Sequence, residues 1–216
     1  MTEQHATPAL PLQRNTRVCN SPSKIVVLIS GDGSNLQAIL DACAAGTLNA
    51  RVAAVISNKR NAFGLERAQR SNVPAIVKSK IKEQDRCEYD GELARLVAAY
   101  QPEWVVLAGW MRVLSSAFLD QFPRHIVNLH PALPGAFPGI HAIERAYAAY
   151  RAGQIAHTGV MVHLVPDESV DNGPVLAQEI VTIRSGDTLE TLTARIHATE
   201  RRLLVGVLIS LCAGKA

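Results

Sequence analysis

Residues 24–35, with the sequence KIVVLISGDGSN, decide the fold. The first half, 24–29, is a continuous apolar run, which is typical of a strand buried on both faces of a parallel sheet. The second half is a glycine-rich turn, and Leu36, Ile39 and Leu40 follow it at helical spacing. A buried strand, a turn and an amphipathic helix in this order predict the first unit of an α/β fold.

The same alternation continues to the end of the chain. Further strands are predicted at 51–57, 73–77, 104–107, 126–130, 158–165 and 175–183, and helices at 36–46, 63–70, 85–100, 115–122, 141–151 and 187–211. The last helix begins with Asp187 or Thr188 as its cap. Right-handed crossovers between such units predict a mostly parallel, twisted sheet with helices on both faces. We expect one domain over 23–216, after a polar, proline-containing and flexible leader at 1–22.

Composition excludes several classes of protein. The net charge of +3 on 216 residues is too small to indicate nucleic-acid binding by itself. Four scattered cysteines without a Cys-x-x-Cys pair indicate neither a disulfide framework nor a zinc site. No apolar run approaches the roughly 18 residues of a membrane span, and the start has no secretory signal. We therefore expect a cytoplasmic enzyme without membrane or nucleic-acid partners, either a monomer or a homodimer.

The glycine-rich turn at 31–35 is the first candidate binding site. Gly33 lets the backbone approach an anion, the helix N-terminus offers free amides, and Ser34 and Asn35 add side-chain donors, so a phosphate is the expected ligand. A Walker-type ATP site is excluded because the Gly-Lys-Ser/Thr ending is absent. A dinucleotide is disfavoured, since the third glycine is missing and the second strand ends without an acid. The alternative is a tight turn in which Ser34 or Asn35 only caps the helix.

The second candidate site combines residues 128–131 (NLHP) with Asp171, about forty residues later. Asn128 and His130 alternate with Leu129 and so point to one face of a strand, and Pro131 ends that strand. Ligands of α/β sheets bind at this carboxyl edge. The Asn amide suits a developing oxyanion and the His ring a proton, while Asp171 orients the ring and raises its pKa. Taken singly, each residue has a structural alternative. Asn128 could hydrogen-bond a loop backbone, His130 could be a buried structural histidine, and Asp171 could be a turn residue.

The other histidines are weaker candidates. His157 and His163 share strand parity, but no third ligand accompanies them, so we expect no metal site. His197 and Glu200 lie one turn apart on the last helix, a spacing more often found on a solvated face, although both could reach a polar ligand.

Several segments, in this order, resemble those of the phosphoribosylglycinamide formyltransferases: 24–39, 57–59, 62–65, 107–115, 128–131 and 171–174. The resemblance implies a single-domain, Rossmann-like formyltransferase fold. It further implies transfer of the formyl group of 10-formyltetrahydrofolate, the cosubstrate, to the amine of glycinamide ribonucleotide in de novo purine synthesis.

The resemblance also implies roles for particular residues. The catalytic group comprises Asn128, His130 and Asp171. The substrate phosphate is bound by Gly33, Ser34 and Asn35, and the ribose is contacted by Glu200. The folate site is lined by Arg86, Met111, Arg112, Val113, Leu114 and Asn128, with the loop that leads to Asp171.

Two alternatives remain open beside the transferase. The same catalytic group could hydrolyse 10-formyltetrahydrofolate, with water in place of the amine. The chain could also be a phosphate-binding module without activity, because residues 132–135 read Ala-Leu-Pro-Gly where the family usually has Ser-Leu-Leu-Pro, and because the sequence stops soon after its last helix. The segment from His163 to Asp171 is one residue longer than usual, which leaves the contacts of the folate loop open.

Overall fold

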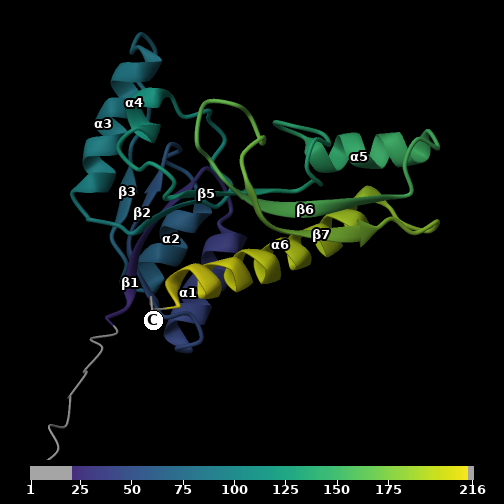
Figure 1. Ribbon diagram of the computed structural model, residues 1–216, viewed down its shortest axis with the longest axis horizontal. Helices are drawn as coiled ribbons and strands as arrows, with labels where there is room; N and C mark the ends of the chain where they lie inside the picture. The colour runs from purple at the N-terminus through teal and green to yellow at the C-terminus, as the bar shows by residue number, and fades with distance from the viewer. Residues whose placement is uncertain (1–20, 214–216) are drawn as a thin grey trace, which may run out of the picture.

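A computed structural model describes residues 21–213 as six helices packed on a seven-stranded sheet (Figure 1). The strands are β1 Ser23–Ile29, β2 Ala50–Ser57, β3 Ala75–Val77, β4 Trp104–Leu107, β5 Ile126–His130, β6 His157–Leu164 and β7 Val175–Thr182. The helices are α1 Ser34–Ala44, α2 Phe63–Arg70, α3 Arg86–Ala98, α4 Ser116–Leu119, α5 Ala142–Arg151 and α6 Leu189–Cys212. Most of the predicted leader lies outside the described residues.

Each predicted helix and strand is present, and α4 differs most in length. It ends at Leu119 rather than continuing to Phe122. Beyond Leu119 the chain forms a turn, in which the amide of Phe122 donates to the carbonyl of Leu119 at 3.0 Å, and this turn leads into β5.

The sheet has the order β3-β2-β1-β4-β5-β6-β7. The first five of these strands pair in parallel, whereas β6 is antiparallel to both β5 and β7. The predicted mostly parallel α/β architecture is therefore confirmed. The chain builds outward from β1 to β3 and then returns to β4 on the other side of β1. A crevice forms at the carboxyl ends of the strands at such a switch point.

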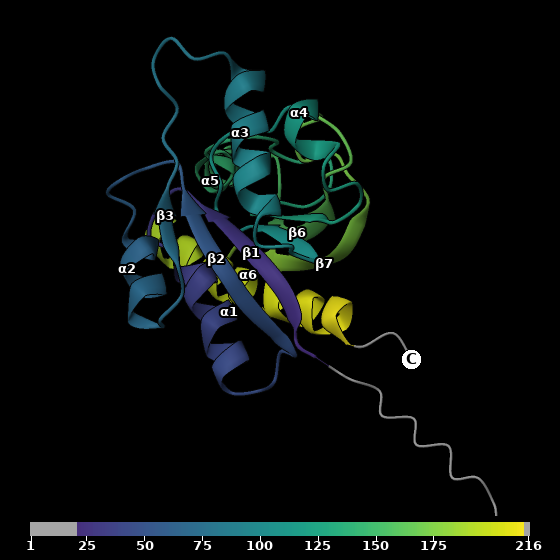
Figure 2. The same ribbon diagram turned by 90° about the vertical axis from the view of Figure 1, so that its left-hand side faces the viewer.

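Helices cover both faces of the sheet, as predicted (Figure 2). Ile25 and Ile29 of β1 belong to the core under α1, α2 and α6, whereas Val26 and Leu28 belong to the core under α3 and α4. All four side chains are fully buried. Burial on both faces explains why β1 reads as a continuous apolar run rather than as an alternating one.

The connection between β6 and β7, residues 165–174, is closed at its base. The amide of Leu164 donates to the carbonyl of Pro174 at 2.9 Å. A Cβ atom at Gly173 would lie 1.7 Å from the carbonyl oxygen of Leu164, so only glycine fits there. Residues 165–172 therefore form a loop whose two ends are fixed by the sheet.

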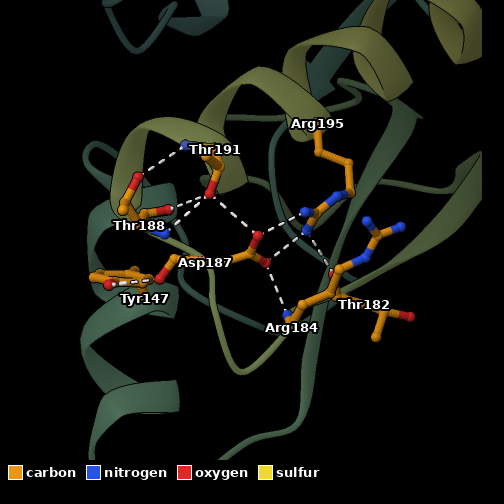
Figure 3. A network of polar contacts seen from close by, with 7 residues as sticks. All are labelled: Tyr147, Thr182, Arg184, Asp187, Thr188, Thr191 and Arg195. Atoms are coloured by element: carbon orange, nitrogen blue, oxygen red, sulfur yellow. Dashed lines mark hydrogen bonds and ion pairs between the residues drawn. The ribbon is translucent and has the colours of Figure 1, made fainter.

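The start of α6 is fixed by a polar network (Figure 3). Of the two predicted caps, Thr188 is the one that caps the helix, because its hydroxyl accepts from the amide of Thr191 at 3.3 Å. Asp187 instead forms two 2.7 Å bonds to the guanidinium of Arg195, and these bonds hold the pKa of its carboxyl far below the usual range. Its backbone carbonyl accepts from the Tyr147 hydroxyl of α5 at 3.0 Å. This network fixes the helix that carries His197 and Glu200.

Candidate active site

A cavity of about 240 Å³ lies at the carboxyl edge of β4 and β5. It is lined by residues from four segments: 107–114, 128–131, 139–142 and 163–171. The first two segments continue directly from the ends of β4 and β5, and the last includes most of the β6–β7 loop. The position matches the crevice expected from the strand order.

Asn128, His130 and Asp171 meet in this cavity, as the sequence predicts. His130 Nδ1 lies 3.2 Å from Asp171 Oδ2, and Asn128 Nδ2 donates to Asp171 Oδ1 at 3.0 Å. The amide of Gly139 donates to Asp171 Oδ2 at 2.8 Å. The side chains of His130 and Asp171 are only 4% and 9% exposed, so the group is shielded from bulk water.

Asp171 is held in an unusual backbone conformation with φ 52°. Aspartate is one of the few residues that tolerate this left-handed region. Burial raises the pKa of its carboxyl, but contacts from His163, the Gly139 amide and His130 outweigh burial, and the pKa lies below the usual value. The residue is therefore an anion near neutral pH.

The pKa of His130 corrects one expectation. From the sequence we expect Asp171 to raise this pKa, so that a protonated ring acts on the substrate. In the structure burial lowers the pKa of His130 below 6.5, and the opposing effects of Asp171 and of the backbone at Ala136 and Phe137 do not compensate. The buried ring is therefore mainly neutral at pH 7, with the Nδ1 proton directed to Asp171.

His163 is a member of the site that the sequence argument missed. It lies opposite Asn128 in the β5–β6 register, is 1% exposed, and its Nε2 accepts from Asn128 Nδ2 at 3.1 Å. Its Nδ1 contacts the carbonyl of Leu164 at 2.8 Å, which fixes the proton on Nδ1 and leaves Nε2 as an acceptor. The sequence shows only that His163 lies on the same face of its predicted strand as His157. The antiparallel pairing of β5 with β6 is what brings this ring to Asn128.

The glycine loop begins α1 without a side-chain cap. Gly33 occupies the N-cap position with φ 76°, and neither Ser34 nor Asn35 caps the helix, so the alternative of a capping turn is wrong. A Cβ atom at Gly33 would lie 2.6 Å from Cα of Gly64, the second residue of α2. The loop is thus pressed against α2, and its helix N-terminus offers amide donors to an anion.

The glycine loop lies at the same sheet edge as the cavity but does not line it. The Ser30 hydroxyl, directly after β1, accepts from the amide of Met111 at 2.8 Å. Because β1, β4 and β5 are consecutive in the sheet, about 10 Å separates the ends of β1 and β5. Ser34 lines a second, more open hollow of about 760 Å³ between α1, α2 and α6.

Glu200 is buried rather than on a solvated face. It is 5% exposed, and its Oε2 lies 2.6 Å from Nδ1 of the half-exposed His197. The hydrogen bond to Glu200 raises the pKa of His197, and the charge of Asp32 in the glycine loop contributes to this effect. The pair therefore lies near the loop, although neither residue lines either hollow.

The residues predicted for folate divide into two groups. The segment 111–114 lines the cavity, with Met111 59% exposed at its mouth. Arg86 does not line it and instead forms an ion pair with Glu168 of the β6–β7 loop. The guanidinium of Arg112 stacks 4.9 Å from the ring centroid of Tyr89, so its stem is fixed against α3.

Metal and membrane features can be assessed for residues 21–213. Within this range no group of three or more His, Cys, Asp and Glu side chains is arranged to hold a metal ion. No described helix combines the length and apolar character that would let it cross a membrane.

Comparisons with known proteins agree with this geometry. Residues 23–208 match the family model described as formyl transferase. A phosphoribosylglycinamide formyltransferase of Schizosaccharomyces pombe is 48% identical over 85% of this chain and 94% of its own length, and one of Escherichia coli is 42% identical over 83% and 82%. The crystal structure of glycinamide ribonucleotide transformylase 1 from Symbiobacterium toebii superposes with a TM-score of 0.83 at 41% identity, covering 89% of this chain and 88% of that one.

The chain therefore belongs to the formyl transferase family, whose members are enzymes that transfer one-carbon units. Within that family it belongs with the phosphoribosylglycinamide formyltransferases, the group that the sequence motifs indicate.

Proposed function

We propose that the chain transfers the formyl group of 10-formyltetrahydrofolate to the amine of glycinamide ribonucleotide, a step of de novo purine synthesis in the cytoplasm. The observation that carries the proposal is the shielded cluster of Asn128, His130 and Asp171, about two strand spacings from a glycine loop suited to phosphate. The names of the relatives, at 40–48% identity, support the same substrate.

Neutral His130 acts as the proton acceptor in this proposal. Attack of the amine on the formyl carbon places negative charge on the formyl oxygen and leaves a proton on nitrogen that must depart. With the Nδ1 proton directed to Asp171, Nε2 is the accepting atom of the ring, and it is buried without a hydrogen-bond partner among the described residues. Once His130 is protonated, Asp171 stabilises the positive ring. Collapse of the tetrahedral intermediate then breaks the bond between the formyl carbon and nitrogen 10 of the folate. His130 gives its proton to that leaving nitrogen, which releases tetrahydrofolate and returns the ring to its neutral form.

Asn128 supplies the donor to the developing oxyanion. Its two N–H groups are already directed to Asp171 and His163, at 3.0 and 3.1 Å. One of these bonds must therefore exchange for a bond to the oxyanion in the transition state. The bond to neutral His163 is the weaker of the two, since the bond to Asp171 is assisted by charge.

The remaining residues bind the two substrates. Gly33, Ser34 and Asn35 hold the phosphate, and Glu200 contacts the ribose. The folate lies along the apolar segment 111–114, in the cavity that also contains the catalytic group. The chemistry needs no metal, because Asn128 and His130 together stabilise the charge and move the proton.

Hydrolysis of 10-formyltetrahydrofolate is the second candidate, and the relatives described above are all named as transferases. Incubation of the purified chain with both substrates separates the two. Formyl transfer predicts a folate absorbance change that requires the ribonucleotide, whereas hydrolysis predicts formate without it. Absence of any ribonucleotide-dependent change, beside an active control enzyme, would contradict the proposal.

A further inference from the structure

Glu168 joins opposite walls of the cavity. It belongs to the β6–β7 loop, and one carboxylate oxygen pairs with Arg86, the first residue of α3. The other oxygen accepts from the amide of Ser116 at 2.9 Å, at the start of α4. Both views of the fold show this loop reaching toward α4 (Figures 1 and 2).

The two partners of Glu168 do not line the cavity themselves but belong to α3 and α4, the helices behind the wall formed by segment 111–114. Asp90, on the next turn of α3, is fully buried, and its carboxylate accepts from the amide of Ser115 at 2.7 Å. Tyr89 packs beneath the Arg112 guanidinium and donates to the carbonyl of Lys78 at 2.5 Å. This wall is therefore a fixed support, and the β6–β7 loop is the part attached to it.

The same loop carries Asp171, three residues after Glu168. The base of the loop is fixed by the pairing of Leu164 with Pro174, so its far end depends on contacts of its own. At that end Glu168 contacts the opposite wall, while Asp171 contacts His130 and Asn128.

We propose that Glu168 is a positioning residue for Asp171. By bridging Arg86 and the Ser116 amide, it keeps the β6–β7 loop closed across the cavity and so keeps the Asp171 carboxylate against the His130 ring. The inference rests on the proposed function for its catalytic consequence, but the closure itself is a property of the protein alone.

We call the bridge from Glu168 to Arg86 and the Ser116 amide the latch. Glu168→Gln tests it, with Glu88→Gln as the matched control. Glu88 is an exposed glutamate of α3, so its substitution removes the same charge without touching the loop. Glu168→Gln weakens both contacts, and we expect hydrogen exchange at the Ser116 amide, which donates to Glu168, to accelerate about fivefold, as for loss of an exposed charged contact. Arg86→Gln, measured by exchange alone, should produce a smaller acceleration because the Ser116 contact remains.

Two further readouts separate positioning from a merely structural role. Asp171 raises the pKa of His130, so release of the loop should move the NMR titration of the His130 ring to lower pH. The kcat of formyl transfer should fall about fivefold while KM for the ribonucleotide is unchanged. Glu88→Gln should match the wild type in all three measurements.

Several outcomes would overturn the latch. Unchanged exchange in Glu168→Gln would show that the loop does not depend on this residue. Faster exchange with an unaltered His130 titration would show that Asp171 is held independently. If Glu168→Gln binds the folate more tightly or turns over faster than the wild type, Glu168 does not position Asp171. It would instead compete with a substrate carboxylate for Arg86. If the wild type transfers no formyl group while the exchange and titration change as expected, the latch stands and the proposed function fails.

Discussion

The glycine loop and the proposed catalytic group are built in opposite ways, although both lie at one edge of the sheet. The loop is formed by consecutive residues, and its shape is set by the backbone, with Gly33 in a left-handed conformation against α2. The catalytic group joins side chains 43 residues apart, and its shape is set by hydrogen bonds to Asp171. Backbone amides suit tight binding of a fixed charge, whereas side-chain groups can exchange protons and partners during a reaction.

Loss of His130 should have the largest effect of these substitutions. The effect should be on turnover and not on binding of the ribonucleotide. His130→Ala removes the proposed proton acceptor, so we expect kcat to fall by about 10²- to 10⁴-fold with little change in ribonucleotide affinity. Steady-state kinetics and direct binding of the ribonucleotide measure the two quantities. His157→Ala, an exposed histidine at the start of β6, is the control. Undiminished turnover in His130→Ala would remove the proposed role.

Substitution of the glycine-loop side chains should show the converse pattern. The double variant Ser34→Ala, Asn35→Ala removes donors to the phosphate in ground and transition state alike. KM for the ribonucleotide should therefore rise about tenfold or more, with kcat nearly constant. KM for the folate is the internal control and should not move. A fall in kcat with constant KM would place these residues in the chemistry instead.

His163 should affect the catalytic group through Asn128. His163→Ala leaves one N–H of Asn128 without its acceptor, and we expect kcat to fall about five- to tenfold. Because the ring is buried, the free energy of unfolding should also fall, by about 2 kcal/mol. His163→Gln offers a new acceptor near the same place and should recover part of kcat. Equal loss in both variants would argue against an acceptor role.

The pH dependence should show the smallest effect. Burial lowers the pKa of His130, so the acid limb of kcat/KM should have its midpoint below 6.5. The unfolded chain takes up this proton first, so the free energy of unfolding should decrease as pH falls through about 6.5 and level off below the pKa of the folded state. His130→Ala should flatten this part of the stability profile. A midpoint above 6.5 would mean that Asp171 outweighs burial.

Much of the fold follows from local sequence, and so does part of the candidate site. Residues 24–35 specify a strand, a turn and a helix because apolar pattern and glycine chemistry act over a few residues. The meeting of Asn128, His130 and Asp171 follows from strand ends and turns. The contacts of His163 and Glu168 do not, because they depend on the β5–β6 register and on the path of a loop across the cavity. The pKa of His130 likewise depends on how deeply the ring is buried, which no spacing reveals.

The closed base of the β6–β7 loop has a consequence for how the family can vary. Leu164 and Pro174 hold the two strands together independently of what lies between them, and Gly173 leaves no room for the chain to slip at that point. Insertions and deletions between these residues can therefore be absorbed without shifting the sheet. Directed evolution of substrate preference could begin with libraries of altered length between Val165 and Asp167, with Glu168, Asp171 and Gly173 retained.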